Sequence, residues 1–349
     1  MIKVAVLGLG FMGKVHFRYY KEMANVQIIA VCDVSSKVFE DAGSPSGNIA
    51  VSGDPLDLTG VRTYTDFDQM LRETDLDAIS ITLPTYLHSE YTVKSLEAGL
   101  HVLCEKPMAL DVAQCSRMIS ASNESGKLLQ IGHCIRFWPE YVTARELIDS
   151  NRYGRVLAAS LRRLSGTPVW SWDNWLLDGP RSSGACLDLH IHDTDYVSYV
   201  FGMPVAVRSH GIIGPSGEYD HVVTSYIYND DKIVTAEGGW MMSDSFGFEM
   251  SFNIIFERAT ISYDSTRDPV FKVCPSGGKS FTPEVSQGDG YYHELMYFID
   301  KITGRDLPEV LTAQQSMDSI ELTLFEQESI RSKKECVVKL RRGINAGEN

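Results

Sequence analysis

The sequence lacks any uninterrupted apolar stretch of the ~18–20 residues that a membrane-spanning helix needs. It also lacks a basic N-terminal region followed by an apolar stretch and a small-residue cleavage site, because MIKVAVLGLG leads directly into a strand. We therefore expect a cytoplasmic protein with no membrane partner.

Basic residues are scarce relative to acidic ones, 32 Lys and Arg against 46 Asp and Glu, and the formal net charge is −14. Nucleic acids and anionic membranes are bound through clustered Lys and Arg. The charge therefore argues against a nucleic-acid partner, although it leaves room for a local positive pocket.

Cysteine never occurs as a C-x-x-C pair, and the seven cysteines are an odd number scattered along the chain. This pattern favours reduced intracellular thiols over a disulfide framework or a zinc site.

The length of 349 residues is natural for two domains.

The apolar pattern divides the chain into two parts. Short apolar runs alternate with amphipathic stretches up to about residue 132, which predicts βαβ units and a parallel sheet. Later runs of period-2 character predict a mostly antiparallel sheet, followed by helices near 291–303 and 312–331. We predict an α/β protein: a doubly wound parallel domain at 1–125, then an α+β domain at 126–349 whose C-terminal tail is able to pack back on the first.

A glycine-rich turn follows the first strand and opens the first helix. Such a turn brings backbone N–H groups and the positive end of a helix against a pyrophosphate. Its first glycine permits the tight turn, the second the approach of phosphates and the third helix packing. We predict a Rossmann-type dinucleotide site, with a packing turn without ligand as the alternative. The turn comprises Gly8, Leu9, Gly10, Phe11, Met12 and Gly13.

Asp33 ends the second predicted strand, ~20 residues after the turn, where an acid accepts hydrogen bonds from the adenosine ribose. An acid there repels a 2′-phosphate, so we expect NAD, with NADP less favoured. The alternative is that Asp33 only caps the next helix.

Further residues at the carboxyl ends of predicted strands are expected to face the cofactor. Thr82, Pro84 and His88 follow the fourth strand, although His88 is equally compatible with a solvent-facing position in the next helix. Glu105 and Lys106 follow the fifth, in Glu105-Lys106-Pro107. A lysine there is able to donate to a substrate hydroxyl and to carry the charge of a developing alkoxide. Taken alone, this tripeptide also fits a surface turn.

Asp188 and His192 have the spacing D-x-x-x-H, which places both on one face of a helix. His192 then serves as the acid/base of an alcohol oxidation, oriented with Lys106 by Asp188. The alternatives are helix capping with surface charge, or a metal site. The potential ligands of that metal site are His190, His192, Asp193 and Asp195. We predict no metal.

Other residues are candidates for substrate or cofactor contacts. Asp173 and Asn174 precede the Asp188 segment and could bind hydroxyls, and Arg136 could bind cofactor or substrate or be an ordinary surface arginine. Tryptophan side chains offer flat faces for a sugar ring, with core packing at least as natural. They are Trp138, Trp170, Trp172, Trp175 and Trp240, of which Trp172 is the one we predict to bind substrate.

Together these motifs resemble the Gfo/Idh/MocA family, the glucose–fructose oxidoreductase and inositol dehydrogenase group. The resemblance runs through nearly the whole chain. It rests on GLGFMG, TLPTYLH, GLHVLCEKPMAL, GHCIRFWPEY, GACLDLHIHDTD and YYHELMYFIDKITG, in this order. The chain departs from the family pattern at His190, where glycine is frequent, and in having only Gly184 before Ala185 and Cys186.

The resemblance implies a second domain with a large open sheet that forms homodimers or homotetramers. It also implies that Lys106, Asp188 and His192 surround a sugar or cyclitol hydroxyl, with His192 as the proton-transfer residue. We expect an NAD(H)-dependent oxidoreductase of a sugar, inositol or related polyol. The alternatives are redox-assisted glycoside cleavage with tightly bound NAD, a non-catalytic dinucleotide sensor, and a metal-dependent hydrolase.

Overall fold

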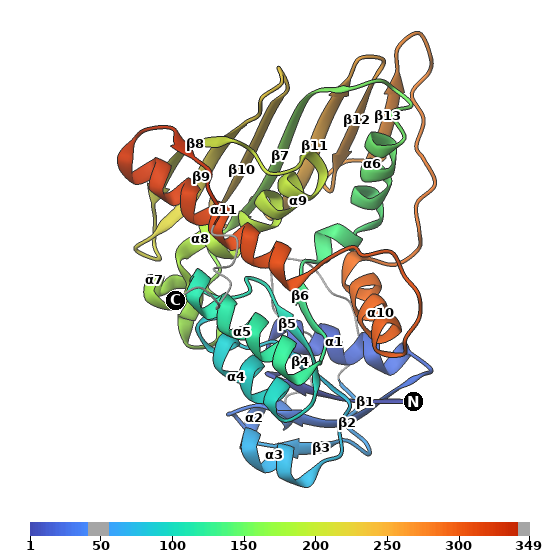
Figure 1. The fold of residues 1–349 in the computed structure, drawn as a ribbon, viewed down its shortest axis with the longest axis vertical. Coiled ribbons are helices and arrows are strands. Elements are labelled where there is room, and N and C mark those ends of the chain that lie inside the picture. Colours follow the sequence, from blue (N-terminus) through green and yellow to red (C-terminus); the bar gives the residue numbers. More distant parts are fainter. Residues whose placement is uncertain (41–55, 341–349) are drawn as a thin grey trace, which may run out of the picture.

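A computed structural model describes residues 1–40 and 56–340. Two sheets lie one above the other, and helices fill the space between them and beside the lower sheet (Figure 1). Among the described residues, no helix combines the length and apolar character needed to cross a bilayer.

The first sheet has six parallel strands in the order β3-β2-β1-β4-β5-β6. The order reverses at β1, so a crevice forms beyond the carboxyl ends of β1 and β4, where dinucleotides bind in such sheets. The strands are β1 (Ile2–Leu7), β2 (Val26–Cys32), β3 (Arg62–Tyr64), β4 (Ala78–Ile81), β5 (His101–Glu105) and β6 (Leu129–Gly132). β6 belongs to this sheet although it lies beyond residue 125, where we expected the boundary.

Short helices connect these strands, and side-chain caps fix where two of them begin. Asp66 accepts a hydrogen bond from the Gln69 amide, and Asp111 accepts one from the Gln114 amide. The helices are α1 (Phe11–Glu22), α2 (Lys37–Glu40), α3 (Phe67–Glu73), α4 (Thr85–Glu97) and α5 (Val112–Ser125).

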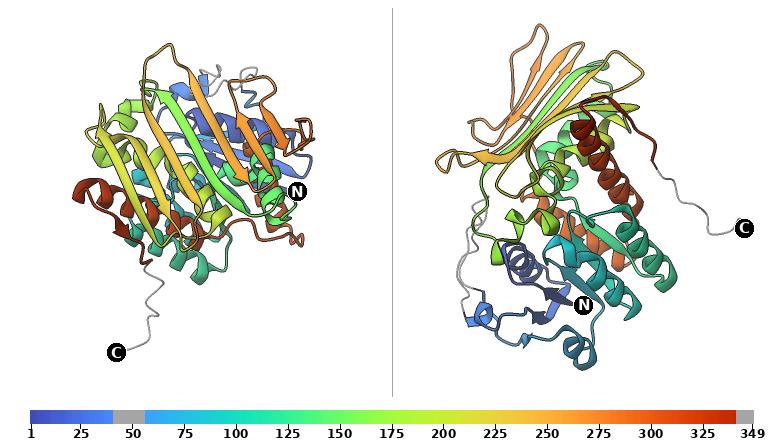
Figure 2. Two further views of the ribbon diagram at one scale, coloured as in Figure 1. Left: turned by 90° about the horizontal axis from the view of Figure 1, so that it is seen from above. Right: turned by 90° about the vertical axis from the view of Figure 1, so that its left-hand side faces the viewer.

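The second sheet has eight strands in the order β13-β12-β11-β7-β10-β9-β8-β14, and only β7 and β10 pair in parallel. Helices cover one face, and the opposite face is open (Figure 2). The strands are β7 (Val156–Gly166), β8 (Ala206–Ile213), β9 (Tyr219–Ile227), β10 (Ile233–Met242), β11 (Phe248–Phe256), β12 (Ala259–Asp264), β13 (Phe271–Pro275) and β14 (Cys336–Val337). The predicted fold class is thus confirmed.

The remaining helices connect the two sheets. They are η1 (Cys134–Phe137), α6 (Pro139–Asp149), η2 (Trp172–Leu177), α7 (Gly179–Ser182), α8 (Gly184–Asp188), α9 (Ile191–Phe201), α10 (Gly290–Ile302) and α11 (Ala313–Ser332). α10 packs on α1, while α11 contacts α5 and β6 on one side and α9 and β8 on the other. The two C-terminal helices therefore connect the two domains. Residues 341–349 lie outside the described part of the chain.

Candidate active site

A cavity of about 530 Å³ lies between the two sheets, at the carboxyl ends of the parallel strands. It brings together twelve predicted site residues from both halves of the chain. They are Gly8, Gly10, Phe11, Met12, Asp33, Thr82, Pro84, Glu105, Lys106, Trp172, Asp188 and His192.

The glycine turn has the geometry that a pyrophosphate requires. Gly8 has a φ of +90°, which favours glycine, and a Cβ on Gly13 would lie 1.8 Å from the Gly8 carbonyl oxygen. A Cβ on Gly10 would meet no atom within 4 Å, so the turn is open beside the cavity. Gly13 itself is outside the lining and acts by letting α1 pack closely.

Asp33 connects this turn to the end of β2. One carboxylate oxygen accepts a hydrogen bond of 2.8 Å from the Leu9 amide, and the other accepts one of 2.9 Å from the Ser35 amide. The carboxylate also lines the cavity, where its remaining lone pairs fit ribose hydroxyls and repel a 2′-phosphate. The residues at this end of the cavity therefore fit NAD.

Lys106 and Asp188 join the end of β5 to the end of α8. The Lys106 ammonium donates to the Asp188 backbone oxygen at 2.8 Å and to its carboxylate at 3.2 Å. Both side chains are about one-sixth exposed, at 15% and 16%. The ammonium is thus held in the cavity by two acceptors and keeps a proton to donate.

His192 lines the same cavity, but it does not share one continuous helix with Asp188. α8 ends at Asp188 and α9 begins at Ile191, so a break replaces the single helix that we predicted. The His192 Nδ1 is buried without a hydrogen-bond partner among the described residues, which leaves Nε2 to meet a ligand. Burial, followed by the positive charge of Lys106, lowers the pKa of His192 well below 6.5, so the ring is a neutral proton acceptor at neutral pH.

Two family models match the chain. One, described as an oxidoreductase family with an NAD-binding Rossmann fold, matches residues 2–133. The other, the GFO/IDH/MocA C-terminal domain, matches residues 141–262. The chain belongs to the Gfo/Idh/MocA family of NAD-binding oxidoreductases.

Curated relatives of this Gfo/Idh/MocA protein include two dehydrogenases. D-glucoside 3-dehydrogenase of Escherichia coli is 29% identical over 247 residues, 68% of this chain and 66% of the relative. Inositol 2-dehydrogenase/D-chiro-inositol 3-dehydrogenase of Lactiplantibacillus plantarum is 30% identical over 195 residues, 55% of this chain but only 50% of the relative. The chain thus aligns with half to just under two thirds of the lengths of these relatives.

A solved structure has the same fold over nearly the whole chain. The WlbA dehydrogenase from Bordetella pertussis, in complex with NADH and UDP-GlcNAcA, superposes with a TM-score of 0.79 at 19% identity. The superposition covers 97% of this chain and 98% of the WlbA chain. The α/β architecture is therefore shared with this dehydrogenase.

His88 does not line the cavity of this Gfo/Idh/MocA protein, contrary to our prediction. The first turn of α4 faces inward, and the imidazole is 1% exposed. Its Nδ1 lies 2.8 Å from the Pro107 carbonyl oxygen and its Nε2 lies 2.7 Å from that of Leu83. His88 therefore braces the two loops that carry Pro84 and Lys106, and does not contact the cofactor site.

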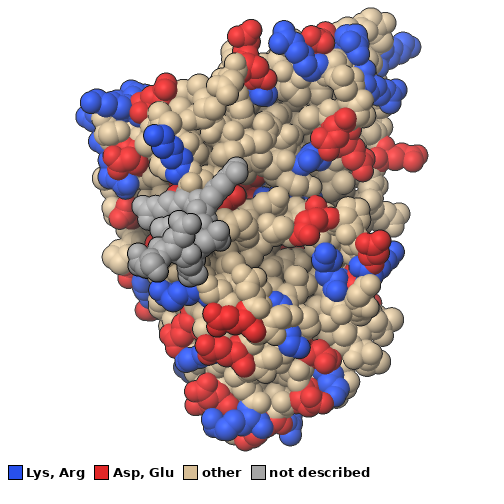
Figure 3. Space-filling model, viewed as in Figure 1, with Lys and Arg blue, Asp and Glu red and all other residues tan. Residues whose placement is uncertain are grey.

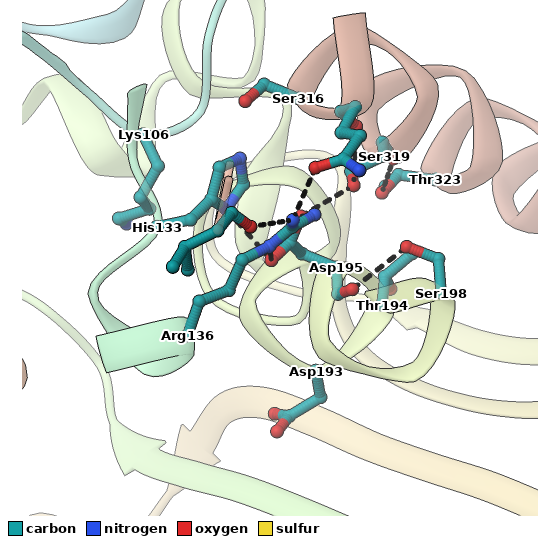
Figure 4. Close-up of polar contacts among 12 residues, drawn as sticks. Lys106, His133, Arg136, Asp193, Thr194, Asp195, Ser198, Ser316, Ser319 and Thr323 are labelled. Carbon is teal, nitrogen blue, oxygen red and sulfur yellow. Dashed lines mark hydrogen bonds and ion pairs between the residues drawn. The ribbon is translucent and has the colours of Figure 1, made fainter. Parts of the chain in front are cut away.

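Arg136 is also outside the cavity, and it is not a surface residue either. Its guanidinium donates two hydrogen bonds of 2.8 Å to Asp195, one of 3.0 Å to the Val310 carbonyl and one of 2.7 Å to Gln315 (Figure 4). Asp195 also lies 3.6 Å from His133, whose pKa burial lowers to about 4. The structure gives no support to a ligand contact, because the Arg136 guanidinium connects η1 to α9 and to the start of α11.

Asp173 and Asn174 lie outside the cavity lining as well. Both have left-handed backbone conformations, with φ of 49° and 50°. The Asp173 carboxylate accepts a hydrogen bond of 2.9 Å from Arg181. The expected hydroxyl-binding role is therefore not supported, whereas their neighbour Trp172 does line the cavity.

The four potential metal ligands of the Asp188 segment point to different partners. Asp193 is paired with Arg163 at 2.9 Å, and Asp195 with Arg136. His190 lies 3.2 Å from Glu326, so only His192 faces the cavity. These residues do not converge on a common point.

Sequence reasoning missed a buried polar cluster beneath the cavity floor. His16 lies 3.0 Å from Glu105, and Glu294 lies close to both, with all three side chains buried. Burial would raise the pKa of Glu105, but the hydrogen bond and charge of His16 outweigh this and lower it. Burial, together with the Glu105 charge, raises the pKa of Glu294 well above its ordinary value. Both effects favour the protonated form of Glu294. The Y-x-x-E pattern in its helix was the sequence signal that could have pointed to this residue.

Proposed function

We propose that this protein is an NAD(H)-dependent oxidoreductase that acts on a hydroxyl-bearing carbon of a sugar, inositol or related polyol. The observation that carries the proposal is the convergence of Lys106, Asp188 and His192 in the cavity that also contains the glycine turn. The names of the curated relatives, which act on a glucoside and on inositols, support the substrate class.

The cofactor end of the cavity would hold NAD through the turn at Gly8 and Gly10 and through Asp33. Backbone N–H groups of the turn and the start of α1 bind the pyrophosphate, and Asp33 binds the adenosine ribose. Thr82 and Pro84 complete the wall on the β4 side. When bound, NAD accepts a hydride from the substrate carbon.

The three polar residues manage the substrate hydroxyl and its proton. The Lys106 ammonium donates a hydrogen bond to the substrate oxygen and stabilises negative charge as it develops there. Asp188 fixes the ammonium through its backbone and side-chain oxygens. The hydroxyl proton moves to Nε2 of neutral His192, because Nδ1 is buried without a hydrogen-bond partner among the described residues.

The test is incubation of the purified protein with NAD and a panel of glycosides, sugars and inositols, followed by absorbance of reduced nicotinamide. At least one member of the panel is expected to give NADH, and Lys106→Met is expected to abolish the signal while retaining NAD binding. Absence of both NADH and NAD binding would contradict the proposal. Net conversion of a glycoside without NADH would favour the redox-neutral alternative.

We further propose that the open face of the second sheet joins copies of this chain into a homodimer or homotetramer. The side chains that point outward from this open face include Val223, Ile233 and Ile255, which are 40–65% exposed. Beside them Arg162 bridges Glu237 at 2.9 Å and Glu249 at 3.1 Å, giving the face both apolar and charged contacts. Light scattering on the purified protein is expected to show a complex of two or four copies of the chain. The Ile233→Asp variant is expected to be a monomer in the same measurement.

We also propose a cytoplasmic location and a small-molecule substrate. All seven cysteines are free, and five of them are buried, as suits a reducing compartment. On the face shown in Figure 3, acidic and basic side chains are interspersed, and the basic ones form no continuous stripe. Because nucleic acids are bound through clustered Lys and Arg, we propose that the protein has no nucleic-acid partner.

A further inference from the structure

Every tryptophan of the chain lines the cavity. The five side chains come from three separate segments: the end of η1, residues 170–175, and β10. Core packing accounts for Trp240, which is 1% exposed and contacts Leu176, Ala185 and Leu189. It also accounts for Trp138, whose ring packs against Tyr291 at 5.7 Å.

Core packing does not account for Trp170 and Trp172, which are 37% and 55% exposed although they line the cavity. Their large apolar surfaces are far more exposed than that of Trp240. The Trp170 ring also lies 5.9 Å from Phe11 of the glycine turn. Trp170 therefore borders the cofactor end of the cavity.

The backbone holds Trp172 in this position. The two residues that follow it, Asp173 and Asn174, have left-handed conformations that break the helix. Arg181 fastens the turn by donating to the Asp173 carboxylate and backbone oxygen, both at 2.9 Å. A third hydrogen bond, of 2.7 Å, joins Arg181 to Asp178 at the start of α7. Trp172 is thus presented by a braced turn.

Two of the three cations that line the cavity are paired with carboxylates. Lys106 is bound to Asp188, and Arg163 donates two hydrogen bonds, of 2.9 and 3.1 Å, to Asp193. A phosphate or carboxylate beside His192 would have to compete with these carboxylates for the two cations. A neutral ligand with an apolar ring meets no such competition and gains contact with the indole faces.

We propose that Trp172, flanked by Trp170, forms a subsite for the aromatic aglycone of a neutral glycoside, whose sugar ring lies deeper, beside Lys106 and His192. This assignment rests on the proposed function, because it places the reacting sugar at the Lys106 end of the cavity. It narrows the substrate class to glycosides with an apolar ring substituent, in preference to nucleotide sugars or free inositols.

Calorimetric titration of the NADH-bound protein tests the subsite without turnover. The probes are phenyl and methyl β-D-glucopyranoside, which share a sugar and differ only in the aglycone, and UDP-glucose. The phenyl glycoside is expected to bind about tenfold or more tightly than the methyl glycoside. Trp172→Ala is expected to remove this difference, and Trp172→Phe to retain most of it. Phe281→Ala, at a 43% exposed aromatic residue outside the cavity, serves as the matched control and should change nothing.

Three results would overturn the subsite. They are equal affinity for the two glucosides, tighter binding of UDP-glucose than of the phenyl glucoside, and a loss of NADH affinity in Trp172→Ala with the glucoside preference unchanged. NADH formation from the methyl glucoside or an inositol in the same preparation would show that the proposed function survives such a failure. Failure of every substrate and of NAD binding would remove the proposed function itself.

Discussion

The Lys106 ammonium lies closer to the backbone oxygen of Asp188 than to its carboxylate, at 2.8 Å against 3.2 Å. The end of α8 therefore positions the lysine partly through a main-chain atom that no side-chain substitution removes. The carboxylate adds a charge that faces both the ammonium and the cavity. Lys106 and Asp188 are thus expected to differ in how strongly their substitution affects the reaction.

Replacement of Lys106 by methionine is expected to lower kcat/KM by about 10²- to 10⁴-fold, the range typical for loss of a positioned proton-transfer or charge-stabilising group. Asp188→Asn should cost less, about tenfold, because the backbone oxygen still holds the ammonium. Steady-state kinetics on a substrate identified from the panel measure both effects. Lys94→Met, at an exposed ion pair on α4, is the control. Equal losses in Lys106→Met and Asp188→Asn would contradict this division of roles.

His192 sets the acid side of the pH profile. Burial, then the positive charge of Lys106, lowers the pKa of this imidazole, so its neutral form persists below pH 6.5. In the direction of alcohol oxidation, kcat/KM should therefore stay level from pH 7.5 to 6.5 and decline only at lower pH. The His192→Gln variant should have a low kcat/KM, and its pH profile should lack this decline. A fall in the wild-type rate centred at or above pH 6.5 would show that another group is the base.

The sequence predicted the parts of the site that depend on local geometry. Lys106 and the glycine turn follow parallel strands, and the carboxyl ends of such strands meet at one edge of the sheet, so their convergence could be read from the order of motifs. The same rule failed for His88, because a residue in the first turn of a helix can face either the cavity or the interior of the domain. Its partners, Leu83 and Pro107, are contributed by two different loops.

Other features depend on contacts between distant segments, which a single sequence does not reveal. Arg136 meets Asp195, 59 residues away, and Gln315, 179 residues away, and this pairing decides that it is structural. The helix break after Asp188 has no proline or glycine to announce it. That the tryptophans share one cavity cannot be predicted without knowing how the two sheets pack.

Arg136 is expected to act on stability and not on cofactor affinity. Removing one member of a buried ion pair leaves an uncompensated charge and typically costs about 3–5 kcal/mol. Arg136→Met should therefore lower the free energy of unfolding by roughly this amount in a urea titration. Arg136→Lys keeps the charge, and it should fold with the dissociation constant for NAD within about twofold of wild type. A tenfold weaker NAD affinity in a stably folded Arg136→Lys protein would restore the ligand-binding interpretation.

Glu294 is expected to make the protein less stable as the pH rises. Burial, then the negative charge of Glu105, raises the pKa of this carboxyl in the folded state above the 4.5 of an unfolded chain. The contribution of the protonated Glu294 carboxyl to the free energy of unfolding is fully present below pH 4.5. It is lost as the pH rises through the raised folded-state pKa, at up to about 1.4 kcal/mol per pH unit. Glu294→Gln removes the ionisable group but keeps its shape, so its unfolding temperature should exceed that of wild type at pH 8 and approach it at pH 5. Glu97→Gln, at an exposed position on α4, should show no such divergence. If Glu294→Gln is instead less stable than wild type at pH 8, the carboxylate is ionised there and is held by a partner such as His16.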